Sequence, residues 1–234
     1  MTQDEQKKAA AEHAVKVVEN DVKVGLGTGS TANHFIRAAA AKVKREKLNT
    51  IFVATSTASR ILAEQSGLIV KNIEDVPFLD FTVDGADEID AQFRMIKGGG
   101  GALHREKIVA SSSRFVVCIC DDSKRVDTLG KFPLPVEVSK FGVNPTAWKI
   151  ERALQHLGYT DVKMRLRADA AGMPFVTEGG NAIIDLALGK IKDPEQLDNI
   201  LNNMPGVIET GLFIGLCGVL MLGTDTSVEE ITRK

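Results

Sequence analysis

One stretch, residues 84–107, constrains the fold of this 234-residue chain more than any other. Its sequence is DGADEIDAQFRMIKGGGGALHREK, with four carboxylates in the first seven residues, and later Lys97 followed directly by four consecutive glycines. Glycine loses more backbone entropy on folding than other residues, so a chain keeps four in a row where nothing larger fits. The bare N–H groups of such a loop can face an anion. The stretch therefore predicts a loop that closes around a ligand.

A simpler interpretation of this stretch is an ordinary solvated turn. Asp and Gly clusters are common turn formers, and a run of charges usually lies on the surface. DGAD alone favours that interpretation, since short motifs often match by chance. DGADEID followed at short range by KGGGGAL and REK favours a site instead. The stretch combines acids, a lysine and a loop of bare N–H groups with a second acid, Glu106, in the first turns of a helix. This combination indicates proton transfer on an anionic substrate.

Short apolar runs in the first half of the chain end in polar residues. The predicted strands are residues 21–26, 51–54, 68–71, 78–83 and 114–120, and helices are predicted over 2–19, 59–66 and 105–112. Possible ligand groups follow four strands, at 28–31, 55–59, 84–87 and 121–124. Ligands of open α/β sheets collect at the carboxyl ends of strands, so these groups are expected to meet at one edge.

The loop GLGTGSTANHF, residues 25–35, lies between a predicted strand and a helix. Loop amides and a helix N-terminus both favour a phosphate. The dinucleotide motif GxGxxG fails at Ser30, and the acid that it needs after the second strand is replaced by Thr55. The Walker A motif fails because the loop contains no lysine. The loop therefore suits a small phosphate ester better than a nucleotide.

The pattern changes at Gly130. Strands are predicted over 134–138, 162–167, 175–177 and 181–186, and another starts at Val207. One helix is predicted with Asn144 as N-cap and Pro145 at its first position, and a second starts at Asp193 and Pro194. The order β-α-β-β-α-β is typical of a ferredoxin-like unit. The apolar segment 212–222 is expected to return to the first sheet.

The predicted fold is therefore α/β: a Rossmann-like, mostly parallel sheet domain with an inserted ferredoxin-like α+β lid. Residues 1–130 plus 208–234 are assigned to the first domain, and residues 131–207 to the second. Nothing in the second half resembles a catalytic constellation, so its expected work is closing over the site or packing against another subunit.

Composition excludes several classes of protein. A net charge of -2 argues against a nucleic-acid partner, which needs a basic surface, and the basic residues 42–47 are expected to form a solvated helix end. No stretch approaches the ~20 apolar residues of a membrane span, and the N-terminus is not a signal peptide. Three cysteines favour a reducing, cytoplasmic compartment, with Cys118 and Cys120 in the core. The four scattered histidines form no metal-ligand spacing.

Several motifs together resemble one known family. GLGTGSTA, the hydroxyl-rich residues 55–57, DGADEID, KGGGGAL with REK, and DDSKRVDTLGKFPLPVEV occur in the order and spacing of ribose-5-phosphate isomerases of the A type, along essentially the whole chain. The resemblance implies a Rossmann-like domain with a ferredoxin-like lid, a homodimer or tetramer, and no metal or cofactor. It implies interconversion of D-ribose 5-phosphate and D-ribulose 5-phosphate in the non-oxidative pentose phosphate pathway.

The resemblance also implies residue roles. Glu106 matches the general base, and Asp84, Asp87 and Lys97 match the other catalytic positions. Substrate-binding positions match Thr28, Gly29, Ser30, Thr31, Asp84, Gly85, Ala86, Asp87, Lys97, Gly98, Gly99, Gly100 and Lys124. Lys7 is expected near the phosphate. His104 departs from the family, which more often has a small hydroxyl residue there, and it is expected to be structurally neutral.

The chemistry of an aldose–ketose conversion explains these residue types. A base must move a proton between neighbouring carbons, and positive charge must lie where the enediolate oxygen becomes negative. Glu106 suits the first task, and Lys97 with the glycine N–H groups suits the second. An acid must also open the sugar ring, and the sequence leaves Asp84 and Asp87 as alternatives.

Three other functions are consistent with parts of the sequence. A sugar-phosphate sensor would not need Glu106 and would usually carry a helix-turn-helix, for which there is no room. A coenzyme-A transferase would use a glutamate as nucleophile but needs a groove for a long cofactor. A deaminase of amino-sugar phosphates is the nearest enzyme alternative, and it is expected to turn over glucosamine 6-phosphate.

Overall fold

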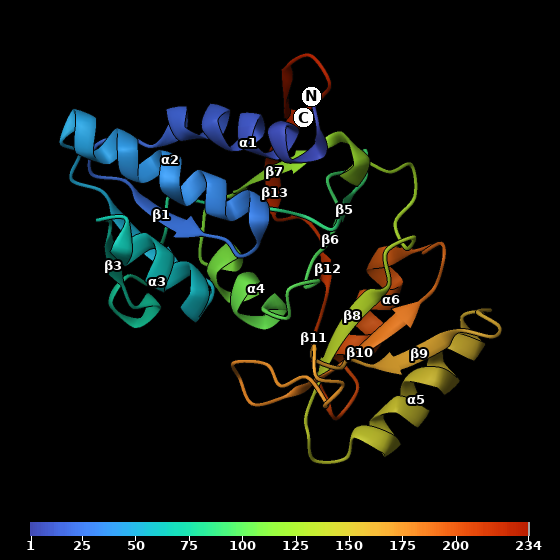
Figure 1. Ribbon diagram of the computed structural model, residues 1–234. Coiled ribbons are helices and arrows are strands. Elements are labelled where there is room, and N and C mark those ends of the chain that lie inside the picture. The colour runs from blue at the N-terminus through green and yellow to red at the C-terminus, as the bar shows by residue number, and fades with distance from the viewer. Residues whose placement is uncertain (234) are drawn as a thin grey trace.

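The computed structural model describes residues 1–233 and arranges them as a large sheet flanked by helices, beside a smaller sheet with two helices of its own (Figure 1). The seven strands of the large sheet lie in the order β14-β13-β7-β4-β1-β2-β3. Their bounds are β1 Lys23–Leu26, β2 Ile51–Ala54, β3 Ile69–Lys71, β4 Phe81–Asp84, β7 Val116–Asp121, β13 Cys217–Gly223 and β14 Val228–Thr232. All neighbours run parallel except β13 and β14. The predicted mostly parallel sheet is confirmed.

The strand order reverses at β1, which pairs with β2 on one side and β4 on the other. The chain leaves β1 through α2 (Ser30–Glu46) toward β2, and α3 (Thr57–Gln65) continues toward β3. From β4 the chain takes the opposite direction, through α4 (Leu103–Ser111) to β7. Loops after β1 and β4 therefore diverge and leave a crevice at their carboxyl ends, the usual ligand position in such sheets.

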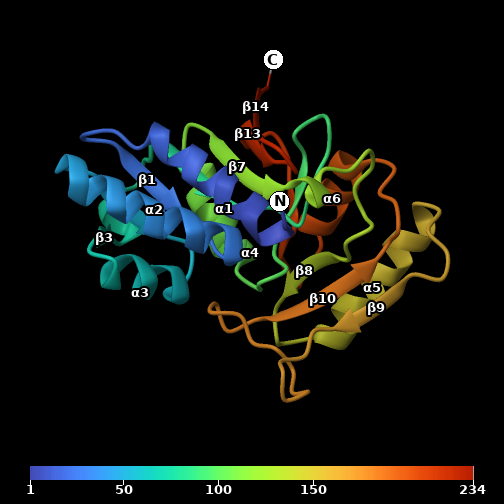
Figure 2. The same ribbon diagram turned by 45° about the horizontal axis from the view of Figure 1, so that its top comes forward.

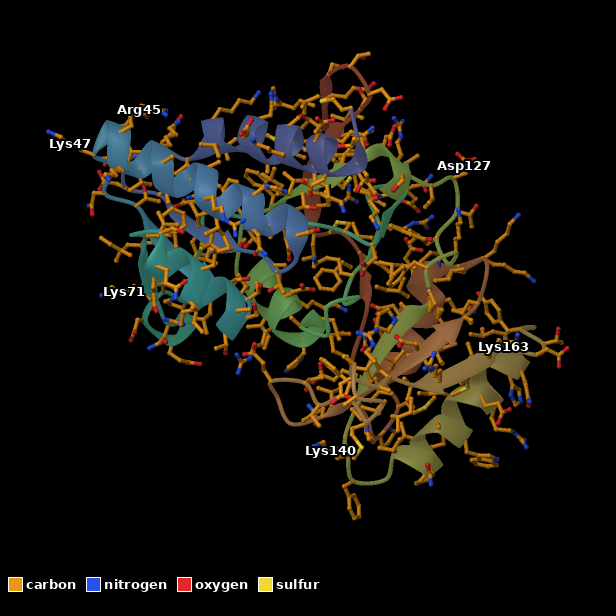
Figure 3. All side chains as sticks on the ribbon, in the orientation of Figure 1. Arg45, Lys47, Lys71, Asp127, Lys140 and Lys163 are labelled. Atoms are coloured by element: carbon orange, nitrogen blue, oxygen red, sulfur yellow. The ribbon has the colours of Figure 1, made fainter. Side chains whose placement is uncertain are left out.

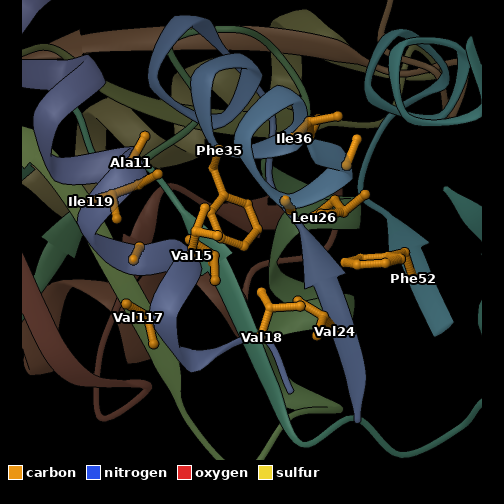
Figure 4. Packing of buried hydrophobic residues seen from close by; sticks show 14 of the residues in the cluster. Ala11, Val15, Val18, Val24, Leu26, Phe35, Ile36, Phe52, Val117 and Ile119 are labelled. Atoms are coloured by element: carbon orange, nitrogen blue, oxygen red, sulfur yellow. The ribbon is translucent and has the colours of Figure 1, made fainter. Parts of the chain in front are cut away.

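Strand β7 shows how the two faces of the large sheet are filled. Val117 and Ile119 point to the face covered by α1 (Gln3–Ala14) and α2, where Phe35 is fully buried (Figure 4). Cys118 and Cys120 alternate with them and therefore pack on the other face, in the cluster that includes Leu103 of α4. The prediction that these two cysteines belong to the core is confirmed.

Helix α1 joins the beginning of the chain to its last strands. It starts with the predicted capping box of Thr2 and Glu5 and lies across β7 and β13. Gln6 Nε2 donates to Asp225 Oδ1 at 2.9 Å. A Cβ added to Gly223 in β13 would lie 2.1 Å from the carbonyl oxygen of Gln6, so only glycine permits this close docking.

The smaller sheet has the order β11-β8-β10-β9 with every pair antiparallel. Its elements are β8 Leu134–Val138, α5 Val143–His156, β9 Lys163–Leu166, β10 Ala182–Ala187, α6 Pro194–Asn202 and β11 Val207–Thr210. The order β-α-β-β-α-β agrees with the predicted ferredoxin-like unit, called the small unit below. Strand β11 runs three residues past the predicted boundary at 207, and the division into domains stays a prediction.

Several predicted element boundaries are wrong for local reasons. Helix α5 begins at Val143 after Gly142, whose φ of 82° makes the turn, so Asn144 is inside the helix and not its cap. Residues 175–177 are not a strand, since the pairing there is limited to an isolated bridge between Ala168 and Pro174 and the bond from Phe175 N–H to Arg167 O. The first helix ends at Ala14 and continues as a short 3₁₀ turn, η1 (Val15–Val17).

The apolar segment 212–222 forms two strands instead of one. Its first part, β12 (Leu212–Phe213), joins β6 (Met95–Ile96) and β5 (Glu88–Ile89) in a small third sheet, and β13 returns to the large sheet as expected. The basic residues 42–47 end α2, and Arg45 and Lys47 point away from the protein, as expected for a solvated helix end (Figure 3). Among residues 1–233, no helix has the length and apolar character needed to cross a membrane.

Candidate active site

A cavity of about 140 Å³ opens at the reversal point of the large sheet. The loops after β1 and β4, the glycine loop (residues 98–101), α1 and α4 all contribute to its wall. It is lined by Lys7, Thr28, Gly29, Ser30, Thr31, Gly85, Ala86, Asp87, Lys97, Gly98, Gly99, Gly100, Glu106 and Lys124. The structure therefore brings every predicted site residue to one cavity except Asp84, which lies directly beneath it.

Lys97, which follows β6, is the cation at the centre of the site. Its Nζ lies 2.8 Å from Asp84 Oδ2 and 3.5 Å from Glu106 Oε2. The same ammonium group donates to the carbonyl oxygen of Gly85 at 2.7 Å. Burial alone would lower the pKa of Lys97, but the charges of Asp84 and Glu106 outweigh it, so the pKa is raised. Lys97 is therefore held as a fixed positive charge.

Glu106 lies in the first turns of α4, as predicted, and is only 4% exposed. Burial raises its pKa to about 8; Lys97 opposes this shift, and the negative charges of Asp84 and Asp87 add to it. Its Oε2 atom is buried and accepts no hydrogen bond from residues 1–233. A carboxylate with a pKa near neutral and an unused lone pair suits a group that takes up and returns a proton.

Asp84 ties the loops after β1 and β4 together. Its Oδ1 accepts hydrogen bonds from Thr28 N–H at 3.1 Å and Gly85 N–H at 2.7 Å. A Cβ added to Gly27 would lie 1.9 Å from this same oxygen, so the loop can approach only because residue 27 is glycine. Burial raises the pKa of Asp84, and the nearby Lys97 opposes that shift.

Asp87 differs from Asp84 because its side chain reaches the cavity wall. Its Oδ2 accepts the N–H of Gly99 at 2.7 Å. A Cβ on Gly99 would lie 2.6 Å from the other carboxylate oxygen, so the glycine loop and this acid meet closely. Asp87 therefore contacts both the cavity and the glycine loop, whereas Asp84 supports the site from below.

The opposite end of the cavity suits an anion. Helix α2 begins after Gly29, whose φ is 112°, and no side chain caps its first N–H groups. Ser30 and Thr31 add hydroxyl groups at the same place. Lys7 and Lys124 reach this cavity from elsewhere in the chain, and neither forms an ion pair with residues 1–233. A helix N-terminus with two uncommitted lysines is a favourable phosphate position.

The hydroxyl groups after β2 do not line this cavity, so the expectation that they supply ligand groups is wrong. Thr28 Oγ1 instead bonds to Thr55 Oγ1 at 2.7 Å and to Ser56 Oγ at 2.8 Å. Ser59 Oγ donates to the carbonyl oxygen of Gly27 at 2.7 Å. Strand β2 lies on the far side of β1 from β4. Its end therefore supports the loop between β1 and α2 (residues 27–29, called the phosphate-type loop below) on the side away from β4.

Some polar residues near the site carried no recognisable sequence signal. Arg167 donates to the carbonyl oxygens of Gly98 and Gly99 from the small unit. Glu178, expected only as part of a turn, accepts hydrogen bonds from Thr57 and from Arg105. Both belong to the long loop between β9 and β10 that extends toward α3 and α4 (Figure 2).

His104 points away from the main cavity. It lines a separate, smaller cavity together with Glu137, and His104 Nδ1 and Glu137 Oε2 are both buried without a hydrogen-bond partner among the described residues.

Within residues 1–233, no three His, Cys, Asp or Glu side chains form a group that could hold a metal ion.

The fold and the site together define a Rossmann-like α/β protein with a buried acid–base centre beside a phosphate-type loop. A sequence profile described as "Ribose 5-phosphate isomerase A (phosphoriboisomerase A)" matches residues 51–227. The chain belongs to this family.

Individual relatives agree over the full length. The chain is 50% identical over 231 residues to "Ribose-5-phosphate isomerase A" of Parvibaculum lavamentivorans, covering 99% of each chain, and 48% identical over 234 residues to that of Methylorubrum extorquens, covering 99% of this chain and 98% of the relative. Among solved structures, ribose 5-phosphate isomerase from Plasmodium falciparum matches with a TM-score of 0.93 at 30% identity, over 99% of each chain. A D-ribose-5-phosphate isomerase in complex with phospho-erythronic acid matches with a TM-score of 0.90 at 36% identity, over 100% of each chain.

Proposed function

We propose that this chain interconverts D-ribose 5-phosphate and D-ribulose 5-phosphate through an enediolate, with Glu106 as the general base. The observation that carries this proposal is the buried Glu106 carboxylate, which has an unused oxygen facing the fixed positive charge of Lys97. Such a pair can remove a carbon-bound proton and stabilise the negative charge that results. Full-length relatives with this name support the substrate.

Substrate binding begins at the phosphate. The N–H groups and hydroxyls of residues 28–31, with Lys7 and Lys124, hold the phosphate dianion at one end of the cavity. The reacting carbons then lie toward Glu106 and the glycine loop. A related structure in complex with phospho-erythronic acid supports a ligand that carries a phosphate.

Ring opening precedes the proton transfer, since ribose 5-phosphate is mostly cyclic. An acid must protonate the ring oxygen as its bond to C1 breaks, and the resulting carboxylate takes up the proton of the C1 hydroxyl to leave the aldehyde. We assign this role to Asp87, because its carboxyl group lines the cavity while Asp84 lies beneath, held by Lys97 and two N–H groups.

The isomerisation then proceeds at the open-chain aldehyde. Glu106 removes the proton from C2, the C1 carbonyl oxygen becomes negative, and Lys97 with the N–H groups of the glycine loop stabilises that charge. Protonated Glu106 returns the proton to C1, and the proton of the C2 hydroxyl passes to the negative C1 oxygen, which leaves a ketone at C2 and a hydroxyl at C1. Atoms and charge balance without any external reactant. General base catalysis of this kind contributes typically ~10²–10⁴-fold.

One alternative enzyme is less consistent with the site, and two other functions stay open to test. A coenzyme-A transferase needs a groove for a long cofactor, whereas the cavity of about 140 Å³ is small beside the roughly 300–1,000 Å³ typical of pockets for larger ligands. A deaminase of amino-sugar phosphates remains a testable alternative, because it would use the same phosphate end. A sensor would bind the sugar phosphate without turnover.

We further propose that the protein acts in the cytoplasm as a homodimer. The three cysteines are buried as free thiols in the core, which suits a reducing compartment. Phe141 and Trp148 of the small unit are 93% and 59% exposed, which suits a surface that another subunit covers. Sedimentation equilibrium over a concentration series tests the dimer, and a monomer at all concentrations contradicts it.

The deciding experiment measures conversion of ribose 5-phosphate by the pure protein with EDTA present, beside Glu106→Gln. We expect activity in the parent and a loss of about 10³-fold or more in kcat for the variant, with sugar-phosphate binding retained. Glucosamine 6-phosphate is assayed in parallel. A parent that binds ribose 5-phosphate without converting it supports the sensor, and an active Glu106→Gln variant removes Glu106 as the base.

A further inference from the structure

The guanidinium group of Arg167 crosses from the small unit to the glycine loop. Its Nη1 donates to Gly98 O at 2.7 Å and to Gly99 O at 3.2 Å. Arg167 follows strand β9 directly and lies 69 residues beyond Gly98 in the chain. It does not line the main cavity, so its only route to the site passes through the backbone of the loop.

The small unit holds this guanidinium in one orientation. Its Nε donates to Asp185 Oδ2 at 3.0 Å and its Nη2 to Asp185 Oδ1 at 2.5 Å, a bidentate pair. The ring of Phe175 lies 6.0 Å from the guanidinium carbon, and the same ring packs closely against Gly101. Asp185 already neutralises the charge of Arg167. Arg167 therefore acts on the loop by orienting its carbonyl groups, and not by adding positive charge to the site.

The bonds from Arg167 to the two carbonyls also fix the directions in which the N–H groups of Gly99 and Gly100 point. In a trans peptide, the carbonyl and the following N–H point opposite ways. Arg167 draws the carbonyls of Gly98 and Gly99 toward the small unit, so the N–H groups of Gly99 and Gly100 point away from it. The Gly99 N–H accordingly donates to Asp87 Oδ2 at 2.7 Å. The Gly100 N–H has no acceptor among the described residues, and Gly100 lines the cavity.

The loop needs such an external restraint because its residues are glycines. Glycine adopts positive and negative φ with similar ease, so either peptide could otherwise turn its carbonyl into the cavity. A carbonyl oxygen there would repel an anionic substrate instead of stabilising it.

We propose that Arg167 is a positioning residue that fixes the N–H groups of Gly99 and Gly100 toward the cavity. On the proposed function, on which this inference rests, the Gly100 N–H stabilises the oxygen that becomes negative in the enediolate. The small unit thereby takes part in the reaction through the backbone of the large one, without touching the substrate.

The first test compares Arg167→Met with Arg165→Met. Arg165 lies on β9, two residues before Arg167, and its exposed side chain makes no hydrogen bond or ion pair in the described chain, so it is a matched control. We expect kcat to fall about 10–100-fold for Arg167→Met with KM changed less than about threefold, because the lost stabilisation acts on the transition state. Arg165→Met is expected to equal the parent.

A conservative variant separates geometry from charge. Arg167→Lys keeps the positive charge but has no planar fork to bind Asp185 and both carbonyls together. We expect it to recover less than about a third of the lost kcat. Asp185→Asn is expected to lower kcat less than Arg167→Met does, and the double variant should be no worse than Arg167→Met alone, since both act through one contact. Full recovery by Arg167→Lys would contradict a geometric role.

A binding measurement tests the same inference without turnover. Phospho-erythronic acid carries a planar carboxylate that resembles the enediolate, whereas inorganic phosphate occupies only the phosphate end. In Arg167→Met, we expect Kd for phospho-erythronic acid to rise about 10-fold or more and Kd for inorganic phosphate to change less than about twofold.

The possible outcomes are distinguishable. Equal values for the Arg167 and Arg165 variants overturn the inference. Parallel loss of phosphate binding and a lowered Tm also overturn it, because they indicate general disorder of the site. If the parent fails to convert ribose 5-phosphate, the proposed function fails, and the two dissociation constants still decide whether Arg167 orients the loop.

Discussion

Two glycine-bearing loops form the cavity, and they are supported in opposite ways. The phosphate-type loop after β1 is held by its own sheet, through Asp84 of β4 and the hydroxyl cluster that follows β2. The glycine loop before α4 donates one N–H to Asp87, but its carbonyls are held by Arg167 of the small unit, whose Phe175 also packs against it. The first loop is therefore complete once the large sheet has formed, whereas the second depends on how the small unit sits against it.

The largest effect that tests this comparison is expected at Gly27→Ala. The added Cβ would lie 1.9 Å from Asp84 Oδ1, so the loop or Asp84 must move. We expect a loss of about 2–3 kcal/mol in the free energy of unfolding and a fall of about 10²-fold or more in kcat/KM. Chemical denaturation and steady-state kinetics measure both.

Gly172→Ala is the control for that variant. Gly172 has a φ of 78° and nothing within 4 Å of an added Cβ, so the substitution introduces strain without a clash. It should cost only about 1 kcal/mol and leave kcat/KM unchanged. Similar losses at both positions would remove the special support that Asp84 gives to the first loop.

The pH dependence of turnover should report the protonation of Glu106, which lies in α4 directly after the glycine loop. On the proposed mechanism the active form of Glu106 is the carboxylate, and burial raises the pKa of this group to about 8. Lowering the pH through that value protonates the base, so kcat/KM should fall about tenfold per unit below it and level off above it.

Only the range above pH 7 is diagnostic, because the phosphate of the substrate ionises near pH ~6. The residual rate of Glu106→Gln should show no such slope. A rate that is flat between pH 7 and 8 in the parent would mean that another group acts as the base.

Lys124→Met should affect the phosphate end alone. The Lys124 ammonium reaches the cavity without an ion-pair partner in the described chain, so its charge is available to the substrate. We expect KM to rise about tenfold, with kcat within about threefold of the parent, because this contact is the same in the ground and transition states. A fall in kcat with unchanged KM would place Lys124 at the reacting carbons instead.

The smallest effect is expected at His104→Ser. The imidazole faces the separate cavity beside Glu137 and does not reach the main one. We expect kcat/KM to stay within about twofold and the free energy of unfolding within about 0.5 kcal/mol. Thermal melts followed by circular dichroism and steady-state kinetics measure both quantities. Larger changes would show that the buried imidazole nitrogen helps to hold α4 in place.

The sequence allowed the first loop to be predicted more completely than the second. Apolar runs that end in polar residues indicated the parallel sheet, and the geometry of such sheets brought Thr28, Asp84 and Lys124 to one edge. The glycine run and Glu106 were also placed correctly, because strand, loop and helix follow one another in the chain. These are local patterns, and the fold rules for parallel sheets extend them reliably.

What the sequence did not indicate depends on contacts between distant residues. Arg167 is one of several arginines, and nothing near it predicts a bond to a carbonyl 69 residues away. Similarly, the hydroxyls after β2 looked like ligand groups until the strand order placed them behind Thr28. The choice of Asn144 as a helix cap failed because Gly142 could make the turn two residues earlier.

The docking of α1 on β13 makes one end of the cavity depend on residues that are far apart in the chain. Lys7 reaches the phosphate end only because its helix lies on β7 and β13, with Gln6 bound to Asp225 and seated against Gly223. Gln6 and Asp225 are 219 positions apart in the sequence, so this contact closes a very long loop of the chain. A chain in which β13 has not yet paired therefore carries Lys7 unplaced, and this end of the cavity is assembled only after the long-range contact has formed.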